Sequence, residues 1–206
     1  MTLKVGIFVF PEVEVLDFAG PYEVFTTASR VFGRRHSAAE KPFAVFTVGA
    51  TGEPFKARAG LPVLPEYAFT THPPIDLLIV PGGVVSAELA EPKVSRWIAQ
   101  VATGTRITAS VCTGAFLLAK AGLLDGHRAT THWEDLAELR TDFPAVRVIN
   151  DQRWVDEGDI VTSGGISAGI DMSLHLVERL AGRELAVQTA RQMEYRWSEP
   201  PTGEKP

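Results

Sequence analysis

Short runs of apolar, β-branched residues alternate along the chain with stretches whose apolar residues recur at helical spacing. A strand covered on both faces needs no polar side, so a nearly continuous apolar run is typical of a central parallel strand. The sequence predicts such strands at 3–10, 43–48, 75–80 and 106–110. Their alternation with helices predicts a single α/β domain with a doubly wound, mainly parallel sheet and helices on both faces.

The helices are predicted from apolar spacing and from the residues that open or end each stretch. Gly20-Pro21 opens the first, because proline is tolerated in a first helical turn. The predicted helices are 21–31, 93–102, 114–124 and a long region after Gly165. The proline-rich segment 49–74 predicts a hairpin or an irregular crossing. Short late strands are predicted at 146–149, 154–155 and 160–162, with a hairpin turn between the last two.

The domain is expected to span residues 1–197. The remaining segment, 198–206, has three prolines and no apolar anchor, so it is predicted to be a disordered tail.

Composition and charge indicate which partners and which cell compartment the protein is expected to have. The 206 residues are 45% hydrophobic and carry a formal charge of -5, with the basic residues scattered, which argues against nucleic-acid or anionic-membrane partners. The apolar runs are far shorter than the roughly 20 residues of a membrane helix. One cysteine cannot form an internal disulfide, and no signal-peptide pattern opens the chain, so a cytoplasmic protein is expected.

That only cysteine, Cys112, follows a β-branched run and precedes a helix-forming one, which predicts a sharp strand-to-helix turn. A nucleophile often occupies such a turn, and the first free amides of the following helix would favour the thiolate. A lone cysteine among apolar residues can instead be inert packing. The small neighbours Ser110, Thr113 and Gly114 favour the nucleophile.

Asp17 lies between Leu16 and Phe18, just before a predicted helix. A carboxyl group walled by apolar side chains loses solvation, which raises its pKa and lets it donate or take a proton beside the thiol. Asp17 could equally cap the helix or form an Asx turn. Glu23 is the substitute candidate, although a surface helix position explains it better.

Three further positions surround the predicted site. The amides of Gly82 and Gly83, together with the N–H that follows Cys112, could form a cradle for negative charge on an intermediate, or the glycines could simply make a tight turn. The Thr113 hydroxyl could bond locally at the helix start, or bind a substrate atom or a water. His132 is the one histidine expected to line the pocket, although a lone histidine is more often structural.

No metal site is predicted, because His127 and His132 have no third ligand in view. Gly164-Gly165 lacks the spacing of a dinucleotide fingerprint, so no cofactor is predicted.

Six motifs, in this order, resemble those of the ThiJ/PfpI superfamily and, within it, the isocyanide hydratases. They are the segments 10–21, 80–83, 110–114, 121–126, 129–133 and 163–171, and the resemblance as a whole spans Lys4 to Trp197.

The resemblance implies a flavodoxin-like fold and a homodimer, with Cys112 as nucleophile and Asp17 as its acidic partner. It further implies cofactor-free hydration of an isocyanide, a small-molecule substrate, to an N-substituted formamide through a covalent thioimidate. Peptidase-like members carry histidine at the position of Thr113, and members that sense oxidation or handle glyoxals carry glutamate at the position of Asp17. The same motifs occur in the sensor domains of AraC-type regulators, so a non-catalytic sensory or cysteine-oxidation-responsive domain is the alternative. A hydrolase of unknown substrate, with His132 as base, is a third reading.

Overall fold

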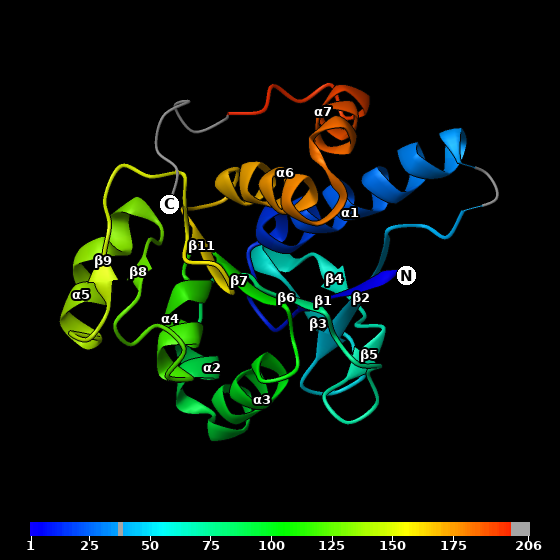
Figure 1. Cartoon of the computed structure of the whole chain (residues 1–206). Coiled ribbons are helices and arrows are strands. Elements are labelled where there is room, and N and C mark those ends of the chain that lie inside the picture. Colours follow the sequence, from blue (N-terminus) through cyan, green and yellow to red (C-terminus); the bar gives the residue numbers. More distant parts are fainter. Residues whose placement is uncertain (37–38, 199–206) are drawn as a thin grey trace.

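The computed structural model describes residues 1–36 and 39–198. Its core is a seven-stranded sheet in the order β10-β11-β7-β6-β1-β2-β5, in which every neighbouring pair is parallel except β10 and β11 (Figure 1). The strands are β1 (Leu3–Phe8), β2 (Phe43–Gly49), β5 (Tyr67–Ala68), β6 (Leu77–Val80), β7 (Ile107–Val111), β10 (Trp154–Asp156) and β11 (Ile160–Ser163). The predicted doubly wound, mainly parallel sheet is confirmed.

Helices cover both faces of the sheet (Figure 1). Successive side chains of a strand point to opposite faces, so Leu77 and Ile79 of β6 pack into one apolar core while Leu78 and Val80 pack into the other. The first core is closed by α1 (Val15–Arg35), α6 (Ala168–Ala181) and α7 (Arg183–Gln192), and the second by α2 (Ser86–Ala90), α3 (Pro92–Ala102) and α4 (Gly114–Lys120).

Smaller elements connect these layers. An antiparallel pair, β3 (Phe55–Lys56) and β4 (Pro62–Val63), encloses the 3-10 turn η1 (Arg58–Gly60) and confirms the hairpin predicted within 49–74. A parallel pair, β8 (Arg128–Ala129) and β9 (Arg147–Val148), flanks η2 (Trp133–Asp135) and α5 (Leu136–Asp142). Elements α2, β8 and α5 were not predicted, because each is short and its apolar residues are weakly periodic.

The strand register places the functional loops at one edge of the sheet. Val80 of β6 is paired with Ser110 of β7, and Ile7 of β1 is paired with Ile79. Because all three strands run in the same direction, the loops after them emerge together at their carboxyl ends, where parallel α/β sheets bind ligands.

Two helix boundaries differ from the prediction. Helix α1 begins at Val15, six residues before the predicted start, and contains Pro21. Proline lacks an N–H, so the Asp17 carbonyl receives no helical hydrogen bond, but burial of Asp17, Gly20 and Val24 on the sheet outweighs this local cost. The long helical region after Gly165 is two helices, divided at Gly182, whose φ of 95° breaks the first.

The C-terminal segment is attached to α6 through Asp171, which is fully buried. Trp197 Nε1–H donates to the carbonyl oxygen of Asp171 at 3.2 Å, and the Ser198 N–H donates to Asp171 Oδ1 at 2.9 Å. Arg153 forms an ion pair with the same carboxylate. Ser198 is therefore bonded to the domain rather than part of a disordered tail, whereas residues 199–206 lie outside the described residues. The domain limit at 197 stays a prediction.

Within residues 1–36 and 39–198, none of the helices has the length and apolar character needed to cross a membrane.

Candidate active site

The predicted turn at Cys112 is confirmed. Cys112 lies directly after β7 and two residues before α4, and its φ of 57° is in the left-handed region that non-glycine residues rarely adopt. Its N–H donates to the carbonyl oxygens of Ser163 and Gly164, both at 3.2 Å. Its own carbonyl oxygen accepts from Thr131 Oγ1 at 2.8 Å. These bonds from two neighbouring segments hold the residue in its unusual conformation, as is common at functional sites.

Gly114 lets this turn approach the end of β6. A Cβ at Gly114 would collide with the carbonyl oxygen of Val80 and lie 2.9 Å from the carbonyl carbon of Pro81. Only glycine therefore allows the Cys112 turn and the Pro81-Gly82-Gly83 turn to pack this closely.

Asp17 lies in the first turn of α1 and is fully buried. Burial raises the pKa of Asp17 to about 7, and the negative charge of Glu14 adds to that rise. The N–H groups of Gly82 and Ile166 and the thiol of Cys112 act in the opposite direction, because they stabilise the carboxylate. The predicted rise in the pKa of Asp17 is confirmed, and the carboxyl group titrates close to neutral pH.

The prediction that Cys112 is a thiolate is wrong for the protein without substrate, in which the sulfur keeps its proton. Burial raises the pKa of Cys112 to about 12, and the nearby Asp17 charge raises it further than the Thr113 N–H can lower it. The start of α4 does face the sulfur as expected, but desolvation and a neighbouring carboxylate outweigh it.

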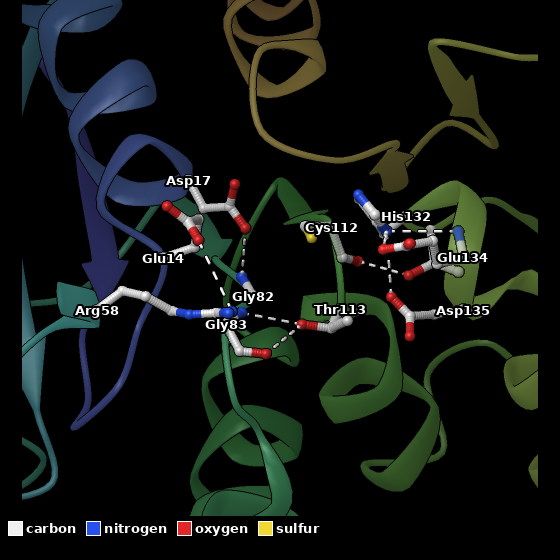
Figure 2. Close-up of polar contacts among 11 residues, drawn as sticks. Glu14, Asp17, Arg58, Gly82, Gly83, Cys112, Thr113, His132, Glu134 and Asp135 are labelled. Atoms are coloured by element: carbon white, nitrogen blue, oxygen red, sulfur yellow. Dashed lines mark hydrogen bonds and ion pairs between the residues drawn. The ribbon is translucent and has the colours of Figure 1, made fainter.

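Asp17 and Cys112 therefore form a coupled pair (Figure 2). Above the pKa of the carboxyl group, one proton remains on the sulfur beside an ionised carboxylate, and the pair shares it. A carboxylate that titrates near pH 7 is well matched to take the thiol proton at the moment the sulfur attacks a substrate.

The glycine amides expected to form an anion cradle already have acceptors. The Gly82 N–H donates to Asp17 Oδ2 at 3.1 Å, and the Gly83 N–H donates to Thr113 Oγ1 at 2.9 Å (Figure 2). Thr113 Oγ1–H in turn donates to the Gly83 carbonyl oxygen at 2.9 Å. In this structure both glycines position Asp17 and Thr113 instead of offering free donors. The Thr113 hydroxyl ties the Cys112 turn to the neighbouring β6 turn instead of bonding within its own helix start, and its contact with a substrate atom or a water stays a prediction.

His132 lies beside the site, where its ring packs against Gly165. Its Nδ1 accepts from the Glu134 N–H at 3.4 Å and lies 3.4 Å from Asp135 Oδ2. Among the residues the structure describes, no hydrogen bond or ion pair joins His132 to Asp17 or Cys112. These contacts favour a structural histidine at the start of η2, and its role as a pocket-lining residue stays a prediction.

Two charged residues near Asp17, Glu14 and Arg58, were not predicted, and the predicted substitute was Glu23. Glu23 is exposed and bonds to Thr27 and Arg30, away from Cys112. Glu14 and Arg58 instead form an ion pair at 3.9 Å beside Asp17 (Figure 2). Arg58 is 41 residues from Asp17 along the chain, so no local pattern could have indicated it.

In the described part of the chain, no three histidine, cysteine, aspartate or glutamate side chains are grouped as metal ligands would be.

Comparisons with known proteins agree with this geometry. The sequence profile of the DJ-1/PfpI family matches residues 3–179. The chain is 36% identical over 196 residues to an isonitrile hydratase of Pseudomonas putida, covering 95% of this chain and 79% of that protein. It is 32% identical over 193 residues to the HTH-type transcriptional regulator GbdR of Pseudomonas aeruginosa, covering 93% of this chain but only half of the regulator. Among solved structures, a ThiJ/PfpI family protein from Pseudomonas syringae superposes with a TM-score of 0.83 at 26% identity, covering 98% of this chain and 78% of that one.

Proposed function

The chain belongs to the DJ-1/PfpI family, and from this premise we propose that it hydrates isocyanides to N-substituted formamides, with Cys112 as nucleophile and Asp17 as proton shuttle. Isonitrile is another name for isocyanide, so the similarity to the Pseudomonas putida enzyme supports this substrate class. Thr113 supports both residues by holding the two turns together.

One observation carries the proposal. A thiol on a left-handed turn faces a fully buried carboxyl group whose pKa is raised to about 7. Hydration needs a sulfur nucleophile and a group that alternately takes and gives a proton at neutral pH, and this pair supplies both.

In the first half of the reaction, the Cys112 sulfur attacks the terminal carbon of the isocyanide while its proton passes to the Asp17 carboxylate. A C–S bond forms, and the carbon that becomes negative takes the proton back from Asp17. The product of these steps is a thioimidate, in which the former isocyanide carbon carries one hydrogen and is doubly bonded to nitrogen.

In the second half, the Asp17 carboxylate takes a proton from water as the oxygen adds to the thioimidate carbon, and the nitrogen receives that proton. Collapse of the tetrahedral adduct breaks the C–S bond and forms the formamide carbonyl group. The hydroxyl proton returns to the departing sulfur by way of Asp17, which restores the thiol and the carboxylate.

The test is a formamide assay of purified protein with a simple alkyl or aryl isocyanide, using glyoxal and a small amide as comparison substrates. The proposal predicts one formamide per isocyanide consumed, with loss of turnover in both Cys112→Ala and Cys112→Ser. Consumption of glyoxal alone would refute the hydratase and leave the fold assignment intact.

A sensory domain is the second candidate, because the matched half of the GbdR regulator is similar over nearly the whole of this chain. An oxidation-responsive form is disfavoured by the raised pKa of Cys112, since the thiolate is the species that peroxide oxidises. Exposure to peroxide followed by mass spectrometry separates the two: a stable sulfinate without isocyanide turnover would favour the sensor.

We also propose that the protein is a cytoplasmic homodimer without a nucleic-acid partner. The family resemblance supports the dimer, and the formal charge of -5 and the single cysteine support the other two assignments. Light scattering of the purified protein measures the oligomeric state directly.

A further inference from the structure

Glu14 is joined to Asp17 through the backbone on two sides. The Asp17 N–H donates to the Glu14 carbonyl oxygen at 3.2 Å. The Glu14 N–H donates to the Gly82 carbonyl oxygen at 2.9 Å, while the Gly82 N–H donates to Asp17 Oδ2 at 3.1 Å. These bonds fix the position of Glu14 relative to the buried carboxyl group, so its charge acts on Asp17 from a defined place.

Arg58 is delivered to Glu14 by the β3–β4 hairpin. The Arg58 N–H donates to the Val13 carbonyl oxygen at 3.0 Å, which fastens η1 to the segment before α1. From there the guanidinium Nη1 lies 3.9 Å from Glu14 Oε2 (Figure 2). Both side chains are partly exposed, 51% for Arg58 and 24% for Glu14, so the pair contributes little to stability. Its placement beside a catalytic carboxyl group calls for another explanation.

We propose that Glu14 and Arg58 are positioning residues that act through Asp17: Glu14 strengthens, and Arg58 moderates, the hold of Asp17 on the proton it exchanges with Cys112. The inference rests on the role of Asp17 in the proposed function.

The physical basis is electrostatic. A second negative charge close to Asp17 disfavours its ionised form, and the pKa of Asp17 is indeed raised in part by Glu14. Arg58 offsets part of that charge. Asp17 and Cys112 also act on each other, and the charge of Asp135, at the end of η2, acts on Cys112. His132 lies beside Asp135. On the Asp17 side, Glu14 is the charge that adds to the raised pKa of Asp17, and Arg58 is its ion-pair partner.

The experiment follows alkylation of Cys112 by iodoacetamide across pH 5 to 9. Cys112 is the chain's only cysteine, so the incorporated label reports this sulfur alone. The rate rises as the first proton leaves the coupled pair, and the midpoint reports the pKa of that step. Glu14→Gln is expected to lower the midpoint by about half a pH unit, and Arg58→Gln to raise it by a smaller amount, as expected for single charges close to a group and near the surface.

Glu23→Gln is the matched control, because it removes a glutamate charge from α1, the helix that Glu14 precedes, at a site bonded to Arg30. It should leave the midpoint unchanged. Near-UV circular dichroism checks that each variant is folded. A purely structural role would move both variants in the same direction or neither, and either result overturns the inference. Because no isocyanide is present, opposite shifts would support the inference even if no formamide were ever formed, which would refute only the proposed reaction.

Discussion

The N–H of Gly82 donates a hydrogen bond of 3.1 Å to Oδ2 of Asp17, joining the end of β6 to the first turn of α1. Together with the Ile166 N–H and the Cys112 thiol, this bond stabilises a fully buried carboxylate, because it replaces some of the solvation that burial removes. The same turn passes so close to Thr113 that it also fixes the start of α4.

Substitution of Gly82 by alanine should disrupt the site. A Cβ there would lie 2.5 Å from both N and Oγ1 of Thr113 and 3.0 Å from Asp17 Oδ2, so backbone must move. We expect turnover to fall at least about 100-fold, since misplacement by an ångström is that costly. Gly33→Ala is the control, because a Cβ there meets nothing within 4 Å, and it should raise stability by about 0.5–1 kcal/mol while turnover is retained. Equal loss in the two variants would contradict this account.

Asp17→Asn should make the protein more stable at alkaline pH while removing activity. Burial raises the pKa of Asp17 from its ordinary 3.8 to about 7 in the folded state, so the folded protein holds a proton that the unfolded chain gives up between these values. The contribution of protonated Asp17 to the free energy of unfolding is therefore complete below about pH 4 and is lost as pH rises through 7. Asparagine cannot ionise, so the variant should gain on the order of 4 kcal/mol over wild type at pH 8 and only about 1 kcal/mol at pH 4.5.

Urea unfolding at the two pH values measures this difference. Asp142→Asn, an exposed position at the end of α5, is the control and should show no pH-dependent gain. A gain of the same size at both pH values would mean that ionisation of Asp17 is not its source.

Thr113→Val should reduce turnover roughly 10-fold and destabilise the protein by about 1–3 kcal/mol. Valine matches threonine in shape but leaves the N–H and the carbonyl oxygen of Gly83 without their partner. Thr113→Ser keeps the hydroxyl and should retain most of both properties. Steady-state kinetics and thermal unfolding of the two variants, compared side by side, test whether the hydroxyl itself matters.

Asp156→Asn should destabilise the domain away from the site. Burial acts to raise the pKa of Asp156, but hydrogen bonds from His175 and Gly158 and the charge of Arg179 outweigh it and lower the pKa. The stability this provides is present at neutral pH and is lost as pH falls through that lowered value. We expect a loss of about 2 kcal/mol at pH 7 that shrinks in acid, measured by urea unfolding. Glu178→Gln, on helix α6 beside Arg179, removes only a surface pair and should cost under about 1 kcal/mol.

The parallel sheet and the turn at Cys112 were predictable because both depend on consecutive residues. A continuous apolar run has few ways to be buried, and β7 leads into α4 with only two residues between them. The burial of Asp17 was predicted, but not its cause: Leu16 is exposed at 38%, and the carboxyl group is instead enclosed by the turns that carry Gly82 and Cys112.

The ionisation of Cys112 could not be predicted from the sequence, because it depends on groups that are distant along the chain but close in the fold. The helix-start amide at Thr113 was visible, but its competition with burial and with Asp17, 95 residues away, reversed the predicted ionisation of Cys112. Helix α1 likewise passes through Pro21 because packing on the sheet outweighs a local preference that sequence reasoning weighs alone.

The attachment of Ser198 and Trp197 to Asp171 has a practical consequence for anyone who shortens this protein. Removal of residues beyond 194 would delete both hydrogen bonds to Asp171 and uncover the carboxylate that they help to shield. A trimmed version intended for crystallisation or NMR should therefore retain Ser198, since an end chosen from the family match alone, at residue 179, would cut away α7 as well.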